Sequence, residues 1–95
     1  FIMFYLGIDI AKNTHVASLI DEKGKTIFKG FSFSNTTEGG KSLLEIIKKH
    51  SEFTDVTVGM EATGHYWLSI YSFLSNNINI FYRIGIYTSI KKYFY

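Results

Sequence analysis

The amino-acid sequence predicts an α/β fold, a mixed five-stranded sheet with helices packed on it. Three observations predict this class. Short runs rich in β-branched and aromatic residues are separated by turn residues. Two later intervals instead carry apolar residues at helical spacing. The first three runs follow one another closely, as in an antiparallel meander, whereas the later runs each follow a helix.

The first three predicted strands span residues 3–10, 14–21 and 26–33. The third alternates between apolar and polar residues, as a half-buried strand does. The turn at 22–25 contains Gly24, which can adopt a positive φ angle. Because the connections are short, we expect neighbouring strands to run antiparallel.

A helix is predicted to follow the third strand. Residues 34–37 supply N-cap candidates, and Glu38 stands where the helix dipole favours an acid. The apolar stripe of this helix consists of Leu43, Leu44, Ile46 and Ile47. Lys48 and Lys49 occupy its last turn. The next strand is predicted at 56–61, and the helical crossover before it allows a parallel pairing with the first strand.

The remaining chain adds one helix and one strand to the prediction. The helix opens at residues 63–64 and ends at 76–77, the strand spans 78–82, and an irregular tail covers 83–95. Right-handed crossovers then predict the spatial strand order 3-2-1-4-5. The ribonuclease H-like fold has this order of elements.

Composition limits the range of functions. A chain of 95 residues forms a single domain, and a formal net charge of +2 permits nucleic-acid binding without predicting it. The absence of cysteine excludes disulfides and thiolate metal sites. No apolar run approaches the ~20 residues of a membrane-spanning helix, and the start does not resemble a signal peptide. We therefore expect a cytoplasmic protein.

Two carboxylates each end an apolar run. Asp9 closes residues 4–9 and Glu61 closes residues 56–61, and a glycine stands two residues before each acid. An acid at the end of a buried strand costs free energy unless something binds it. On neighbouring strands, two such acids form a site for a hard cation such as Mg²⁺. The alternative is that Asp9 caps a turn and that Glu61 is solvated at a helix entry.

Further side chains near these acids are candidate nucleic-acid contacts. They are Lys12, Thr63, Gly64, His65 and Tyr66. A lysine binds phosphate, a glycine lets a ligand approach the backbone, and aromatic rings stack on bases. Each also has a structural interpretation, as part of a solvated turn, a helix cap or helix-end packing. Metal ligation by His15, near Asp9, is one interpretation, and an ordinary surface or hydrogen-bonded histidine is the favoured one.

Three segments together resemble the N-terminal part of a DEDD transposase of the insertion-sequence-110 family, which also contains Piv-type DNA invertases. The segments are residues 7–12, residues 33–36 with Gly39 or Gly40 before Leu43, and residues 59–67. The third segment, which reads Gly-Met-Glu-Ala-Thr-Gly-His-Tyr-Trp, carries most of the resemblance. The resemblance spans residues 4 to about 82.

The resemblance implies a RuvC-like catalytic domain with four acids in the order Asp, Glu, Asp, Asp. Asp9 matches the first acid and Glu61 the second. The implied cofactor is Mg²⁺ or Mn²⁺, the implied reaction is DNA strand cleavage and transfer, and the implied substrate is DNA at element ends. A guide RNA is a further implied partner for some members. Because two acids and a second domain are not matched, we expect a partial copy that is inactive alone.

Two other interpretations remain open from the sequence. Actin-like ATPases and sugar kinases share the fold and also begin with Gly-Ile-Asp, although Lys12 stands where their phosphate loop needs a small residue. A non-catalytic nucleic-acid-binding module or a relic is the second alternative. We also expect a homo-oligomer that uses residues 78–95, because an uncovered sheet edge and aromatic tail favour self-association.

Overall fold

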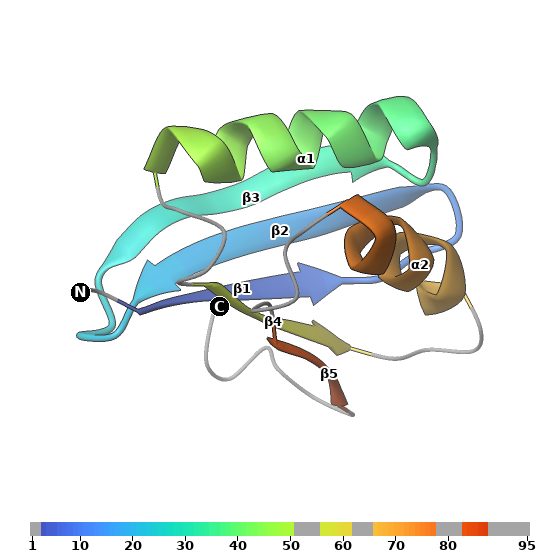
Figure 1. The fold of residues 1–95 in the computed structure, drawn as a ribbon. Coiled ribbons are helices and arrows are strands. Elements are labelled where there is room, and N and C mark those ends of the chain that lie inside the picture. Colours follow the sequence, from blue (N-terminus) through green and yellow to red (C-terminus); the bar gives the residue numbers. More distant parts are fainter. Residues whose placement is uncertain (1–2, 51–55, 62–65, 78–82, 88–95) are drawn as a thin grey trace.

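The computed structural model describes residues 3–50, 56–61, 66–77 and 83–87 of the chain. The elements, in chain order, are β1 (Phe4–Asp9), β2 (Thr14–Asp21), β3 (Thr26–Ser34), α1 (Thr37–His50), β4 (Val56–Glu61), α2 (Trp67–Asn77) and β5 (Arg83–Tyr87). Figure 1 shows them as a twisted sheet with α1 lying along β3. The bounds of β1 to β4 lie within one residue of the predicted strands.

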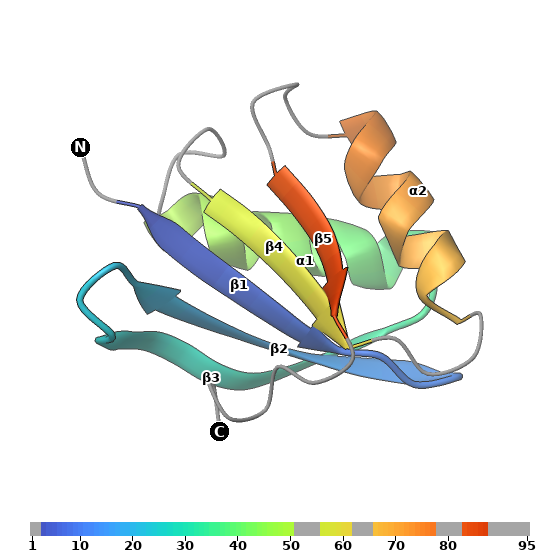
Figure 2. The same ribbon diagram turned by 90° about the horizontal axis from the view of Figure 1, so that it is seen from below.

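The sheet has the order β3-β2-β1-β4-β5. β2 runs antiparallel to both of its neighbours, and β4 runs parallel to β1 (Figure 2). This arrangement confirms the predicted order of the first four strands and the mixed α/β class. The helical connection through α1 is what allows β4 to return parallel to β1.

The fifth strand differs from the prediction. The structure has β5 at Arg83–Tyr87, parallel to β4, where an irregular tail was expected. The predicted strand at 78–82 lies outside the described residues, as does the rest of the predicted tail. Gly85 interrupts the apolar run of β5 and weakens its strand signal, yet it pairs in register with Gly59 of β4. The expectation of an oligomer through residues 78–95 therefore stays a prediction.

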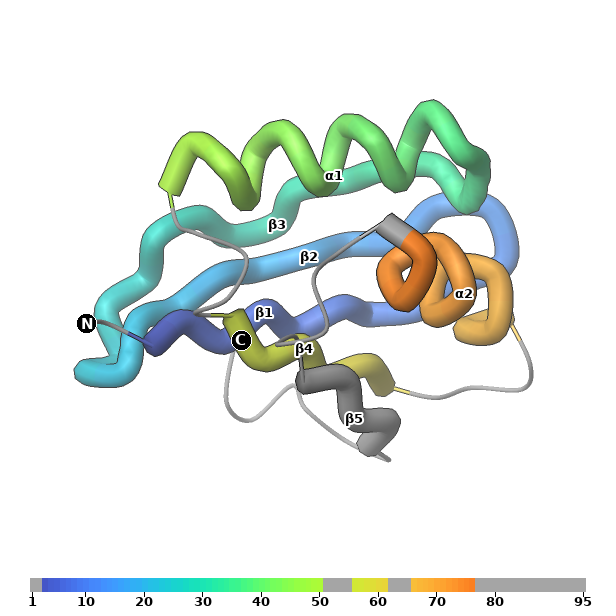
Figure 3. Tube along the Cα trace, in the orientation of Figure 1, coloured from blue at the N-terminus to red at the C-terminus, as the bar shows by residue number. Residues whose placement is uncertain are grey.

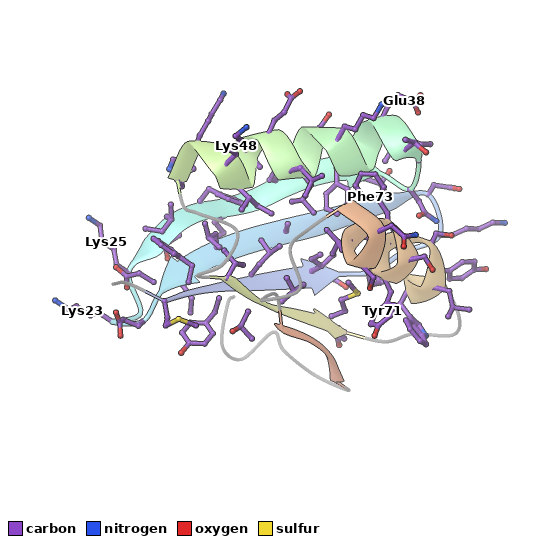
Figure 4. All side chains as sticks on the ribbon, in the orientation of Figure 1. Lys23, Lys25, Glu38, Lys48, Tyr71 and Phe73 are labelled. Atoms are coloured by element: carbon purple, nitrogen blue, oxygen red, sulfur yellow. The ribbon has the colours of Figure 1, made fainter. Side chains whose placement is uncertain are left out.

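Both helices pack on the same face of the sheet and share one hydrophobic core with it. The buried core residues are Leu6, Ile8, Ile10, Ala17, Leu19, Phe33, Leu43, Ile47, Val56, Val58, Met60, Ile70 and Leu74. The two helices meet where Phe73 of α2 approaches Gly40 of α1 (Figure 4). Each fully buried Leu or Ile side chain stabilises the fold by about 1.5–3 kcal/mol.

The turn between β2 and β3 confirms the predicted role of Gly24, whose φ is 83°. The Asp21 carboxylate accepts hydrogen bonds from the backbone N–H groups of Lys23 and Lys25, both at 2.9 Å. The Cα trace in Figure 3 passes through this turn at the end of the sheet opposite Asp9. The turn thus sets the β2–β3 hairpin without touching the candidate site.

Candidate active site

Asp9 and Glu61 lie side by side at the ends of two adjacent parallel strands. The register of β1 and β4 pairs Asp9 with Glu61, and each is the last residue of its strand. Neighbouring strands are about 4.8 Å apart, so the two side chains start from adjacent backbone positions. The sequence-based expectation that these acids lie on adjacent parallel strands is confirmed.

Both acids project from the face of the sheet opposite the helices. Side chains alternate along a strand, and Ile8 and Met60, one residue earlier, are fully buried in the helix-covered core. Asp9 and Glu61 therefore point to the other face, the one that Figure 2 shows in front of α1. Both are partly buried. This places the acids at the carboxyl ends of parallel strands, where open α/β sheets bind ligands.

The burial of one oxygen of the Glu61 carboxylate is not compensated by a hydrogen bond from the described residues. Its Oε2 atom is buried and has no hydrogen-bond partner among the described residues. An unpaired buried carboxylate oxygen costs free energy, and two like charges at directly paired positions destabilise a sheet. A divalent cation between the acids would remove both costs. Carboxylate oxygens are also the donors that Mg²⁺ prefers, so this pair fits a hard divalent ion.

The described residues contribute a pair of acids and not a larger cluster. Within residues 3–50, 56–61, 66–77 and 83–87 the structure has no group of three or more His, Asp or Glu side chains able to hold a metal. A metal ion held by Asp9 and Glu61 would therefore need further ligands from water, substrate or other residues.

His15 lies on the helix-covered face and is fully buried. Its neighbour Val16 is the residue that pairs with Asp9, so alternation turns His15 away from the acids. Its Nδ1 accepts a hydrogen bond from the Ala11 N–H at 3.2 Å, and its ring meets Phe33 edge-on at 5.3 Å. His15 is thus a buried histidine that accepts one hydrogen bond, and its Nε2 has no hydrogen-bond partner among the described residues.

The turn that follows Asp9 presents Lys12 to solvent. The Asn35 side-chain amide donates to the Lys12 carbonyl oxygen at 3.1 Å, and the Asn35 N–H donates to the Asn13 carbonyl at 2.9 Å. In the sequence, Asn35 stands out as an N-cap candidate and as part of the segment 33–36 of the family resemblance. The structure shows a longer-range role, for which the sequence gives no local signal.

Of the remaining candidate contacts, Tyr66 is described and Thr63, Gly64 and His65 lie outside the described residues. Tyr66 directly precedes α2 and is 37% exposed. Trp67 is partly buried against the core, and its ring meets Tyr71 edge-on at 5.6 Å. Trp67 therefore serves in helix-end packing, as the structural interpretation expected.

Comparison with protein-family models bears on the transposase and ATP-binding interpretations of the chain. A family model described as a transposase, the DEDD transposase model of insertion sequence 110, matches residues 6–92. The chain belongs to this transposase family. The match spans both Asp9 and Glu61 and favours a transposase over an ATP-binding domain. A search of curated proteins matches none of them.

The described part of this transposase chain contains no helix with the length and apolar character that a membrane crossing requires. Its longest helix, α1, has 14 residues and carries charged side chains along its exposed side. Family membership implies DNA as the partner of such a protein.

Proposed function

We propose that this domain is the N-terminal catalytic part of a DNA transposase and that Asp9 and Glu61 are its metal-binding carboxylates. The observation that carries the proposal is the parallel, in-register pairing of these two acids at the carboxyl ends of β1 and β4. The sheet order, with β2 antiparallel and β4 parallel to β1, supports a ribonuclease H-like fold of the RuvC type.

Both acids bind metal in this proposal. Asp9, on the central strand β1, and Glu61, which has a buried carboxylate oxygen without a hydrogen-bond partner among the described residues, would together hold the bound ions. Bound Mg²⁺ or Mn²⁺ would supply the Lewis acid that activates the attacking oxygen and stabilises the leaving oxygen. The pairing of β1 with β4 sets the two acids at adjacent backbone positions before any ligand arrives.

DNA is the substrate in this proposal. Lys12 is exposed on the turn directly after β1, at the same end of the sheet as Asp9 and Glu61. A lysine there would bind a DNA phosphate and orient the strand over the acids. The family resemblance adds DNA at element ends as the specific target and a guide RNA as a second partner.

Binding of Mn²⁺ to the 95-residue chain, followed by electron paramagnetic resonance, tests this function. We expect binding that Glu61→Gln and Asp9→Asn each weaken at least tenfold, because either change removes a charged ligand. Glu45→Gln, a matched change at an exposed acid on α1, should leave the affinity unchanged. Equal affinity in the parent and both site variants would contradict the proposal.

A further inference from the structure

The turn from Ile10 to Asn13, which joins β1 to β2, is held mainly by hydrogen bonds from outside itself. Residues 11–14 are exposed, so packing does little to fix them. Asn35 makes two bonds to the turn: its side-chain amide donates to the Lys12 carbonyl at 3.1 Å, and its N–H donates to the Asn13 carbonyl at 2.9 Å. These bonds fix the peptide groups that follow Lys12.

The Ile10–Ala11 peptide, at the start of the turn, is held as well. The Ala11 N–H donates to Nδ1 of His15 at 3.2 Å. His15 is fully buried and its ring packs edge-on against Phe33, so the acceptor itself has little freedom. Lys12 is therefore an exposed lysine with backbone hydrogen bonds in the chain both before and after it.

The segment that carries Asn35 is itself tightly held. Thr36 caps α1, since its Oγ1 accepts a hydrogen bond from the Gly39 N–H at 3.1 Å, and it also lies 2.6 Å from the Ser34 hydroxyl. A Cβ on Gly39 would overlap the Ser34 carbonyl oxygen, so the chain passes closely here. The junction of β3 and α1 thus offers a rigid anchor for the turn after Asp9.

We propose that Asn35 is a positioning residue that sets the direction of Lys12, so that the lysine ammonium contacts a DNA phosphate beside Asp9 and Glu61. The inference rests on the proposed function. Without the Asn35 amide, the Lys12 carbonyl loses its partner and the backbone at Lys12 gains freedom. That freedom must be lost again when DNA binds, which weakens the contact.

A salt-dependent double-mutant cycle tests the proposal. Binding of the 95-residue chain to a short fluorescein-labelled DNA duplex is measured by fluorescence anisotropy at several salt concentrations. The variants are Lys12→Ala, Asn35→Ala, the double variant, and Asn76→Ala as a control at an exposed asparagine on α2. One phosphate contact contributes about 0.9 to the slope of log K against log salt concentration.

The proposal predicts that Lys12→Ala and Asn35→Ala each reduce this slope by about 1. The double variant should show the same slope as Lys12→Ala alone, because the two residues act through one contact. Asn76→Ala should retain the slope of the parent. If Asn35 only stabilises the fold, Asn35→Ala will lower the melting temperature and leave the slope of the folded variant unchanged. This result would overturn the proposal.

Three further outcomes are informative. If Asn35→Ala does not fold, Asn35→Ser, which keeps a small polar side chain but cannot supply the amide donor, takes its place. Failure of both variants to fold would overturn a positioning role. If the parent binds DNA and the two slope reductions add in the double variant, the positioning role of Asn35 is overturned and the proposed function is not. A parent that does not bind DNA would overturn this inference together with the DNA-binding part of the proposed function.

Discussion

Asp9 and Glu61 are register partners, and so are Gly7 and Gly59 two residues before them on the same strands. Gly85 of β5 continues this glycine row, because it pairs with Gly59. By alternation the row lies on the same face of the sheet as the two acids. The sheet therefore presents its carboxylates next to a strip that carries no side chains, with the core packed behind it.

The first prediction concerns the repulsion between the two acids in the absence of metal. Glu61→Gln keeps the size of the side chain and removes one of two adjacent like charges. We expect this variant to be more stable than the parent by about 0.2–1 kcal/mol in metal-free buffer, measured by urea unfolding. Glu45→Gln on α1 should leave the stability unchanged. A Glu61→Gln variant that is less stable than the parent would show that another group already compensates the charge.

The second prediction compares the two glycines of the α1 entry. A Cβ on Gly40 would lie 2.6 Å from the Phe73 ring, which is a side chain and can shift. Gly40→Ala should therefore cost about 1–3 kcal/mol. A Cβ on Gly39 would meet the Ser34 backbone, so Gly39→Ala should cost more, at least ~3 kcal/mol. Thermal unfolding of both variants gives the ranking, and the reverse order would contradict the close approach of Gly39 to Ser34.

The third prediction concerns the packing of α1 on the sheet. Leu43 is fully buried, whereas Leu68 on α2 is 49% exposed. Leu43→Ala should destabilise the domain by about 2–5 kcal/mol, and Leu68→Ala by no more than about 0.5 kcal/mol. Guanidinium unfolding compares the two variants, and both replace the same side chain, leucine, by alanine. Similar losses at both sites would mean that the exposed face of α2 is packed against something in solution.

The fourth prediction concerns the hairpin between β2 and β3. Asp21→Ala removes the acceptor of two N–H groups at 2.9 Å, and we expect a loss of about 1.5–3 kcal/mol in unfolding free energy. Lys23→Ala, in the same turn, is the matched control because it leaves the Asp21 acceptor and both N–H donors in place. Equal stability of the two variants would show that the Asp21 carboxylate does not set this turn.

Local patterns in the sequence were sufficient to predict the elements that bury a regular face. Residues 56–61 alternate, end at an acid and follow a helix, and the structure has β4 at the same residues. Gly24 could be assigned a positive φ because a tight turn between two strands requires one. The alternation of β2 in the sequence also indicates that His15 shares a face with Ala17 and Leu19, and all three are buried.

Features that depend on contacts between distant residues could not be predicted. Asn35 and Lys12 are 23 residues apart, and no local pattern shows that an amide meets a carbonyl across that separation. The irregular register in β3 is a second case: Gly30 has a φ of 72°, and its N–H donates to the Ser18 hydroxyl at 3.2 Å. The position of β5 could not be predicted, because residues 83–87 form a strand through their pairing with β4 and lack a clear strand pattern of their own.

The central claim is that Asp9 and Glu61 together hold a divalent metal ion. The most direct measurement is an anomalous difference map from crystals of the chain soaked in Mn²⁺. The account predicts a Mn²⁺ peak between the two carboxylates, about 2.1–2.2 Å from an oxygen of each, and no such peak in Glu61→Gln crystals soaked in the same way. A peak that persists in Glu61→Gln, or Mn²⁺ bound only at other acids such as Glu38 or Glu45, would contradict it.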